Sequence, residues 1–398
     1  MDKNALGNPC EKHSPFPKFI RKKTVALKDT CVLIMGQSPS SESYNINGEG
    51  LPFYQGNADF GEDNPTPRSW CTDPKKVAEK GDILISVRAP IGAINIANER
   101  CCIGRGIAAI RPNQDLMPTN YLRHQLSASR SKLEAMGTGS TFKAIGKKAL
   151  SDFAVAIYSK SEQEAIVYQL DCIAAQIKAA NNQLIRFDTL VKSRFVEMFG
   201  TYESWKSAAD KTKLESLCWI GSSKRVHKDD YVDNGVPFFR TKEIVELSRG
   251  DQPSTELFIS PEQFKQINEK NGAPLPGDLL ITAVGTIGTI WVVDQREDFY
   301  FKDGNLLWLK PKKANSVYLK YLLEELIASD MGQLTGGTAY KALTIIRLSK
   351  MEIVVPPLAL QQEFAAFVSQ VDKLRFTTQQ QINKLETLKK SLMQEYFE

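Results

Sequence analysis

Apolar residues recur every three or four positions over residues 161–200, which is the spacing that one face of a long helix requires. The residues of this stripe are Ile166, Leu170, Ile173, Ile177, Ala180, Leu184, Phe187, Val191 and Met198. The steps alternate between four and three until a final step of seven, where Arg194 takes the skipped position. This alternation is typical of a coiled-coil helix that lies along a second helix. We therefore predict a spacer helix over residues 159–200.

A second stripe, in residues 358–398, predicts the partner helix. It comprises Phe367, Val371, Leu374, Leu385, Leu388 and Leu392. The two segments end in similar sequences, at Lys192–Phe199 and Lys390–Phe397. Polar residues interrupt both stripes near the middle, at 181–183 and 377–381. Because polar positions in such an interface fix register, we predict an antiparallel pair within the chain, with the two polar belts opposed.

The blocks that precede these helices, residues 19–158 and 201–357, repeat each other. Three pairs of segments correspond, namely 80–84 with 276–280, 104–112 with 303–311, and 141–145 with 339–343. Short β-branched runs follow the Gly-Asp turns at 81–82 and 277–278, and a helical pattern follows near 121–136 and 318–331. The fold class is thus predicted as α+β, with two pseudo-repeated mixed α/β domains joined by two long antiparallel coiled-coil helices.

The blocks differ most in residues 36–80 and 221–276. The first of these stretches is rich in Gly, Pro, Ser and Asn and is interpreted as mostly loop. A framework that repeats while its loops differ suits two binding modules with different targets. Residues 1–18 contain three prolines and little periodicity, and we interpret them as a leader.

Composition and charge restrict the function classes only mildly. Hydrophobic residues make up 42% and charged residues 24%, as in ordinary soluble globular proteins. The seven cysteines form no C-x-x-C pair and the three histidines lie far apart, so we expect no disulfide framework or zinc site and a reducing cytoplasm. The N-terminus is polar and does not predict a signal peptide. The net charge of +5 permits nucleic acid as a partner without demonstrating it.

The sequence marks no catalytic residue. It contains no G-x-x-x-x-G-K-[ST] loop, no dinucleotide motif between a strand and a helix, and no His, Cys and carboxylate cluster with ligand spacing. We therefore expect no metal and no cofactor in this chain.

The order of these motifs resembles the specificity subunits of type I restriction–modification enzymes. The resemblance rests on the segments at 80–84 and 276–280, on Gly104–Pro112, and on Val355–Leu358 with the Gln-Gln-Glu that follows at 361–363. It covers about residues 20–398. The first copy departs from it at 156–158, where Ala-Ile-Tyr replaces the prolines.

The resemblance implies a non-catalytic, DNA-binding recognition subunit. Each block would bind one half of a split double-stranded DNA target, and the helices would set the unread spacer. Two methyltransferase (modification) subunits would dock on the helices and methylate adenine with S-adenosylmethionine. Two restriction subunits, driven by ATP with Mg, could join them. No membrane is implied.

Candidates for DNA contact are donor side chains in loops, especially beside glycine or an aromatic residue. Glycine lets backbone N–H groups approach phosphate, and Arg, Lys, Asn and Gln reach base edges in the major groove. The candidates are Gln55, Asn57, Arg88, Arg105, Thr141 and Lys143 in the first block and Arg240, Thr241, Lys242, Tyr340 and Lys341 in the second. For each of them the alternative is a loop side chain that faces water.

Three other interpretations stay open. One is the recognition subunit of a related restriction–modification system with a different subunit organisation. Another is a coiled-coil adaptor that joins proteins, which uniformly acidic domain faces would favour. The third is an enzyme with unmarked catalytic residues, which a concave site with a strongly perturbed carboxylate or cysteine would favour.

Overall fold

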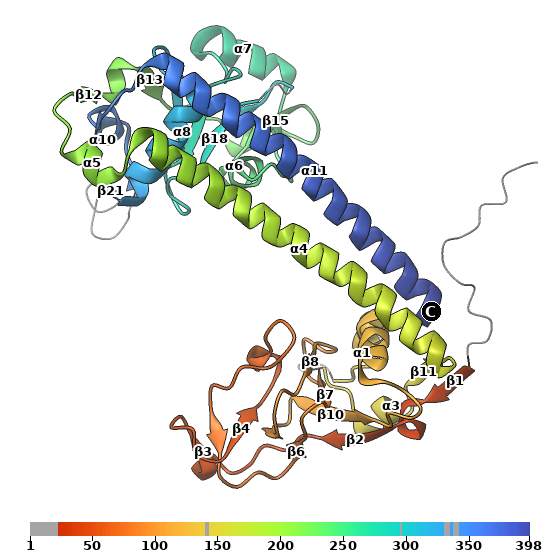
Figure 1. Ribbon diagram of the computed structural model, residues 1–398. Helices are drawn as coiled ribbons and strands as arrows, with labels where there is room; N and C mark the ends of the chain where they lie inside the picture. The colour runs from red at the N-terminus through yellow and green to blue at the C-terminus, as the bar shows by residue number, and fades with distance from the viewer. Residues whose placement is uncertain (1–22, 140–142, 295–296, 330–334, 337–341) are drawn as a thin grey trace, which may run out of the picture. The chain divides into compact units, whose positions relative to one another are not determined.

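The structure is a computed structural model that describes residues 23–139, 143–294, 297–329, 335–336 and 342–398. The predicted leader lies outside the described residues. Two compact units divide the chain, one formed by Met1–Asn181 with Gln380–Glu398 and the other by Asn182–Gln379. Each unit holds one globular domain and about half of each long helix, α4 (Lys160–Phe199) and α11 (Leu358–Phe397) (Figure 1).

Unit 1 is built on a four-stranded antiparallel sheet in the order β2-β10-β7-β8. A five-stranded sheet, β3-β5-β4-β9-β6, contains one parallel pair, β4 with β9, and β1 pairs with β11. The elements are β1 (Lys23–Ala26), η1 (Leu27–Asp29), β2 (Cys31–Met35), η2 (Ser41–Ser43), β3 (Tyr44–Asn45), β4 (Leu51–Tyr54), η3 (Asn57–Asp59), β5 (Trp70–Cys71), β6 (Val77–Ala78), β7 (Ile83–Ser86), β8 (Ile94–Ile96), β9 (Cys101–Ile103), β10 (Ile107–Pro112), α1 (Thr119–Ala128), α2 (Arg130–Ala135), α3 (Lys147–Ser151) and β11 (Ala154–Ile157).

Unit 2 repeats most of this topology, but its second sheet has four strands in place of five and β21 pairs with β22. Its sheets run β13-β20-β17-β18 and β14-β16-β15-β19, the latter with the parallel pair β15 and β19, and β12 pairs with β23. The elements are α5 (Tyr202–Lys206), β12 (Thr212–Lys213), η4 (Leu214–Ser216), β13 (Cys218–Gly221), η5 (Lys228–Asp230), β14 (Tyr231–Val232), β15 (Val236–Phe239), α6 (Thr241–Ser248), β16 (Phe258–Ile259), α7 (Pro261–Asn271), β17 (Leu279–Thr282), β18 (Ile290–Val292), β19 (Tyr300–Phe301), β20 (Leu306–Pro311), α8 (Ser316–Ser329), β21 (Thr335–Gly336), β22 (Ala342–Leu343), α10 (Ile345–Ser349) and β23 (Glu352–Ile353). The internal repeat of the sequence is therefore a repeat of structure.

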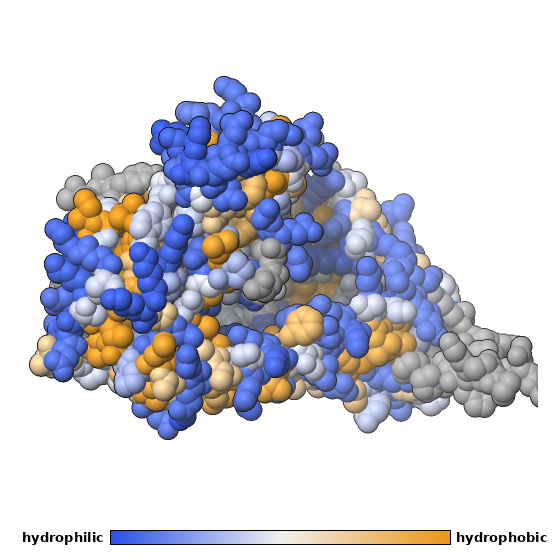
Figure 2. Space-filling model, turned by 90° about the horizontal axis from the view of Figure 1, so that it is seen from above, coloured by the Kyte–Doolittle hydropathy of each residue, from blue (hydrophilic) through white to orange (hydrophobic). Residues whose placement is uncertain are grey.

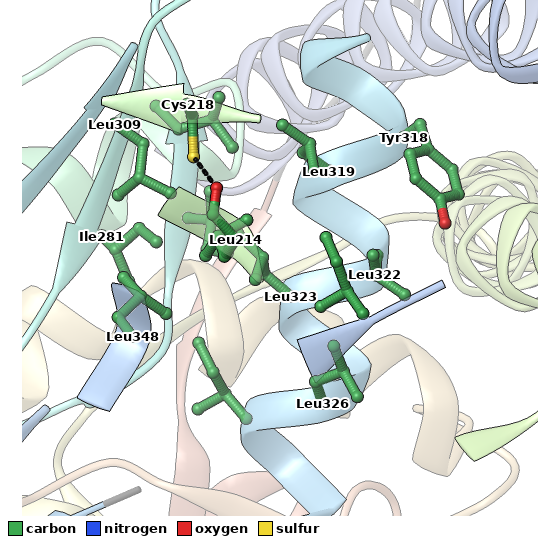
Figure 3. Close-up of a cluster of buried hydrophobic side chains, with 14 of the residues drawn as sticks. Leu214, Cys218, Ile281, Leu309, Tyr318, Leu319, Leu322, Leu323, Leu326 and Leu348 are labelled. Carbon is green, nitrogen blue, oxygen red and sulfur yellow. Dashed lines mark hydrogen bonds between the residues drawn. The ribbon is translucent and has the colours of Figure 1, made fainter. Parts of the chain in front are cut away.

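The four-stranded sheet of each unit is buried on both faces, which explains its unbroken apolar runs. Leu279 and Ile281 of β17 face one core cluster, whereas Leu280 between them faces another. Helix α8 covers the first face: Leu319 and Leu323 lie on the side of the helix toward Ile281, whereas Tyr318 lies on the opposite side (Figure 3).

The aspartate of each Gly-Asp turn closes the turn. Gly81 and Gly277 both have φ of +91°, a conformation that favours glycine. Asp82 Oδ2 accepts a hydrogen bond from Glu79 N at 2.8 Å, and Asp278 Oδ2 accepts one from Leu275 N at 3.0 Å. Arg111 donates to both oxygens of Asp82 at 2.8 Å, whereas Trp308 Nε1 donates to Asp278 at 2.8 Å. The repeated motif thus has a structural role in both units.

A buried glutamine attaches the start of each long helix to the strand before it. Gln163 Nε2 donates to Tyr158 O at 2.9 Å, and Gln361 Nε2 donates to Pro356 O at 2.8 Å. These contacts explain why both helices open with a similar polar sequence, although only the second is preceded by prolines. Helix α4 ends at Phe199, and the next residue, Gly200, has a φ of +84°.

The two helices pair antiparallel. In unit 1, Tyr396 Oη near the end of α11 donates to Gln169 Oε1 near the start of α4 at 2.6 Å. In unit 2, Arg194 near the end of α4 lies 3.1 Å from Glu363 near the start of α11, and Arg375 pairs with Asp188. The opposition of the two polar belts stays a prediction.

The predicted helix interface needs a correction on α11. Leu374 is 54% exposed and Leu388 is 36% exposed, so both lie outside the buried stripe and their placement in the interface is wrong. The stripe comprises Phe364, Val368, Val371, Arg375, Thr378, Ile382, Leu385, Lys389, Leu392 and Tyr396, again in steps of four and three. Half-buried Arg375 and Lys389 take the places assigned to the neighbouring leucines. Long aliphatic stems let such side chains cover apolar surface, and the Arg375 guanidinium pairs with Asp188 of α4.

The other predicted interface residues lie in the cores of their units. Ile166, Leu170, Ile173, Phe187, Val191, Val371 and Leu392 are buried, and Ile177, Leu184 and Leu385 are half-buried against the same clusters.

Candidate nucleic-acid interface

Four of the predicted DNA-contact residues line one hollow in unit 1. The hollow has a volume of about 230 Å³ and is lined by Gln55, Gly56, Asn57, Arg88, Ala89, Arg105 and Gly106. Gln55 and Asn57 follow β4, Arg88 follows β7, and Arg105 lies in the turn between β9 and β10. The fold therefore brings together three segments that are distant in the sequence.

Backbone hydrogen bonds fix the geometry of this hollow. Gly104 N donates to Tyr54 O at 2.8 Å, and Gly106 N donates to Gln55 O at 3.1 Å. A Cβ atom on Gly106 would lie 2.4 Å from Gln55 O, so a larger residue cannot occupy this position without a shift. The two glycines hold the turn against β4 and leave Arg105 exposed between them.

The hollow carries positive charge. Arg88 and Arg105 are exposed, and among the described residues neither guanidinium forms an ion pair with a carboxylate. The nearby Asp59 is engaged with the backbone, since its Oδ2 accepts hydrogen bonds from Gln55 N at 2.8 Å and Gly56 N at 3.3 Å. Two open guanidinium groups beside an amide pair can hold phosphate and hydrogen-bond base edges.

Lys143 lies next to the same hollow. Its carbonyl accepts a hydrogen bond from Ala89 N at 3.2 Å, and Ala144 bridges to both Arg88 and Thr138. The Lys143 side chain is exposed. Thr141 lies outside the described residues.

Unit 2 has an equivalent site, which is formed by the corresponding strands β15 and β19. Phe238 pairs with Tyr300 in unit 2 as Phe53 pairs with Cys102 in unit 1. This register places Arg240 at the position of Gln55. It likewise places Lys242 at the position of Asn57. Lys302 N donates to Phe239 O at 2.8 Å, as Gly104 N does to Tyr54 O. Asp303 and Gly304 stand where unit 1 has Arg105. The two domains therefore present different side chains on one backbone frame.

The candidate cations of unit 2 are paired within the domain. Arg240 Nη2 lies 2.8 Å from Glu243 Oε1 and 3.1 Å from Glu256 Oε2, and Lys242 Nζ lies 3.3 Å from Glu256 Oε1. The hydrogen bond to Glu243 is the main cause of a raised Arg240 pKa. Thr241 is half-buried at the start of α6. Tyr340 and Lys341 lie outside the described residues.

Glu243 and Glu256 were not among the predicted site residues. A signal existed for Glu243, because an acidic residue three positions after the start of a helix commonly closes a capping box. Glu243 Oε2 indeed accepts a hydrogen bond from Arg240 N at 2.8 Å. Glu256 lies in an irregular loop fourteen residues beyond Lys242, and no local pattern marks it.

The described residues contain no metal-binding cluster, and burial affects four of their cysteines. No group of three or more His, Cys, Asp and Glu residues in it is placed to hold a metal ion. Burial raises the pKa of the Cys31 thiol to about 11 and those of Cys101, Cys102 and Cys218 to about 12, which keeps these thiols protonated. None of the helices in the described ranges combines the length and apolarity that a membrane span requires.

Comparison with known proteins agrees with this duplicated arrangement. A model of the family described as "Type I restriction modification DNA specificity domain" matches twice, at residues 21–186 and 207–387. The chain is 46% identical over 141 residues to the provisionally assigned type I restriction enzyme MjaX specificity subunit of Methanocaldococcus jannaschii, a match that covers 35% of this chain and about a third (33%) of that subunit.

Two further similarities extend over nearly the whole length. The type I restriction enzyme MjaIX specificity subunit of the same organism is 23% identical over 92% of this chain and 90% of its own. The crystal structure of the type I restriction–modification S subunit from M. genitalium shares the fold, with a TM-score of 0.58 at 14% identity over 96% of this chain and 97% of that chain. With two family matches that together cover most of its residues, the chain belongs to the type I restriction–modification DNA specificity family.

Proposed function

We propose that the chain is the DNA-binding specificity subunit of a type I restriction–modification complex and is itself non-catalytic. Each domain reads one half of a bipartite target in double-stranded DNA. The observation that carries the proposal is the pair of equivalent positions with different side chains, Gln55 and Asn57 in one domain and Arg240 and Lys242 in the other. Side chains of these types distinguish base pairs in the major groove.

The long helices are proposed to set the spacer between the half-sites and to carry the partner subunits. Large apolar side chains are exposed along both helices, including Tyr168 (72%) and Ile185 on α4 and Phe376 (66%) on α11. Seen from the top of Figure 1, apolar residues form separate patches within a mostly hydrophilic surface (Figure 2). Exposed apolar positions on helices suit protein docking. Two methyltransferase subunits would bind there.

The chemistry of the complex belongs to the partners in this proposal. The methyltransferase subunits would use S-adenosylmethionine to methylate adenine, and two restriction subunits, where present, would use ATP with Mg. The chain would act where DNA and these subunits meet, in the cytoplasm.

A single-molecule methylation map of host DNA, made with and without the gene, tests this function. We expect adenine methylation at one split motif to disappear with the gene. Exchange of the first or second domain with that of another specificity subunit should then change the corresponding half-site alone. Unchanged methylation in a strain that expresses an active methyltransferase partner would refute the DNA-recognition role.

An adaptor that joins proteins without touching DNA is the principal alternative. Such an adaptor would be favoured by acidic domain faces, but the hollow of unit 1 exposes Arg88 and Arg105. Purification of the chain with the proteins that bind its helices, followed by DNA-binding assays of the complex, separates the two functions.

A further inference from the structure

Glu256 lies between the two cations that occupy the recognition positions of unit 2. One carboxylate oxygen lies 3.1 Å from Arg240 Nη2 and the other lies 3.3 Å from Lys242 Nζ. Hydrogen bonds from Arg240 and then Lys242 lower the pKa of Glu256 below its ordinary value. Glu256 is therefore an anion at neutral pH, and it occupies the place where a DNA phosphate or base acceptor would meet the same cations.

The neighbouring Glu243 plays a different part. Its side chain is buried, and it holds both the backbone and the guanidinium of Arg240 at the start of α6. Glu256 instead lies in the irregular loop after α6, and its side chain is 61% exposed. Ser254 attaches this loop to α6 through 2.7 Å hydrogen bonds from its N and Oγ to the carboxylate of Glu246. Glu243 thus positions Arg240 as its main partner, whereas Glu256 pairs with Arg240 from a water-exposed site, where an ion pair contributes little free energy.

Unit 1 differs in this respect. In this unit Asp59, two residues after Asn57, accepts hydrogen bonds from the backbone of Gln55 and Gly56 and lies 3.8 Å from Arg68. Within the described residues no carboxylate pairs with Arg88 or Arg105. One recognition surface is therefore open, and the other is closed by an acid of its own domain.

We infer that Glu256 is a specificity-determining residue that competes with DNA for Arg240 and Lys242. This inference rests on the proposed function. Non-specific binding comes from phosphates that are neutralised by Lys and Arg with release of counterions. Glu256 pairs with Lys242 and shares Arg240 with Glu243, so non-cognate DNA gains little at unit 2. A half-site that offers well-placed acceptors to both cations displaces the Glu256 carboxylate. Other sequences would have to break the same ion pairs without replacing them, and this cost adds to specificity.

The full chain and a random-sequence 40-bp duplex suffice to test this, with Glu256→Gln compared against Glu269→Gln. Glu269 is an exposed residue of α7 in the same unit, so its replacement makes the same charge change away from Arg240 and Lys242. Fluorescence anisotropy between 50 and 200 mM salt should show tighter binding for Glu256→Gln and a salt slope steeper by about 0.9–1.8. Over that salt range the variant should lose about 3- to 12-fold more affinity than the wild type.

A double variant, Glu256→Gln with Lys242→Met, tests whether the gain in binding comes from the cations that Glu256 pairs with or from a general loss of negative charge. We expect Lys242→Met to remove part of the gain of Glu256→Gln, because one of the two released cations is then absent. Equal affinity and slope for Glu256→Gln and Glu269→Gln, in samples with the same thermal unfolding midpoint, would overturn the inference while DNA binding by the wild type stands. If no protein, wild type included, binds duplex DNA, the proposed function fails and this inference fails with it.

A methylation map of cells that carry Glu256→Gln provides the specificity readout. We expect additional methylated sites that keep the first half-site and depart from the second. An unaltered motif together with an unaltered salt slope would contradict the inference.

Discussion

Phe364 offers the sharpest test of how α11 packs onto unit 2. Its side chain is fully buried, and its ring centroid lies 5.3 Å from those of Phe195 and Tyr321 and 5.5 Å from that of Phe199. Phe→Ala changes in cores cost about 3–5 kcal/mol, the sum of lost burial and the cavity left behind. For a unit of this size, the replacement Phe364→Ala should lower the unfolding midpoint by about 6–20 °C.

The control lies on the same helix. Phe376 is 66% exposed, so Phe376→Ala should change the free energy of unfolding by no more than about 0.5 kcal/mol. Tryptophan fluorescence reports mainly on this unit, because it contains Trp205, Trp219, Trp291 and Trp308, and only Trp70 lies in the other unit. Similar midpoints for Phe364→Ala and Phe376→Ala would refute the packing of α11 described above.

Three further predictions concern the candidate DNA contacts of unit 1, a buried histidine and the lengths of the two long helices. Arg88→Ala, Arg105→Ala and Lys143→Ala should each weaken binding to random-sequence duplex and reduce its salt slope by about one; unchanged slopes in anisotropy titrations would exclude these residues from the interface. His124 lies 2.7 Å from Asp171, and burial lowers the pKa of its imidazole below the ordinary value of 6.5. The unfolded chain therefore takes up the imidazole proton before the folded chain does, and the free energy of unfolding should decline as the pH falls below about 6.5. Urea unfolding at pH 7 and pH 5.5 should show a smaller decline for His124→Gln, and an equal decline would assign the effect to other groups. Removal of one turn from both α4 and α11 should change the spacer in the methylation map, whereas an unchanged spacer would contradict the helices as its ruler.

The strands and helices that the sequence predicted are those with a strong local signal. The runs after the Gly-Asp turns became β7 and β17, and the helical patterns near 121–136 and 318–331 became α1 with α2 and α8. The second sheet of each unit was harder to predict, because strands such as β3 and β5 are two residues long and carry no periodicity. They form because distant strands supply their hydrogen bonds.

Two helices of unit 2, α6 and α7, were not predicted. Helix α7 had a recognisable start, since Ser260 Oγ accepts a hydrogen bond from Gln263 N at 3.1 Å and Pro261 follows it. No comparable helix lies between β4 and β6 in unit 1. The two domains therefore vary by inserted structure as well as by side chain.

The error on α11 has a physical cause. A search for leucines selects Leu374 and Leu388, but the adjoining Arg375 and Lys389 continue the four-and-three spacing through Thr378 and Ile382. Hydrophobicity alone cannot choose between two neighbouring registers when the buried one contains long charged side chains. The tertiary contact of Arg375 with Asp188 shows which register is occupied.

Residues that the two domains share are mainly those that shape the backbone. Ser86 and Thr282 accept hydrogen bonds from Ala93 N and Thr289 N at 2.9 Å and hold equivalent loops, while the hydroxyls of Tyr121 and Tyr318 donate to Ala156 O and Val354 O.

The differences, in contrast, gather at one place on this frame. Arg240 replaces Gln55, Lys242 replaces Asn57, and Asp303 with Gly304 replaces Arg105. The shared motif therefore locates the candidate recognition loops in such a repeat, and the residues that we propose to read DNA are those at which the two copies differ. The sequence located both loops that follow β4 and β15. Only the structure distinguishes the open guanidinium groups of unit 1 from the paired cations of unit 2. That distinction depends on the carboxylate of Glu256, which lies in a loop that no sequence pattern marks.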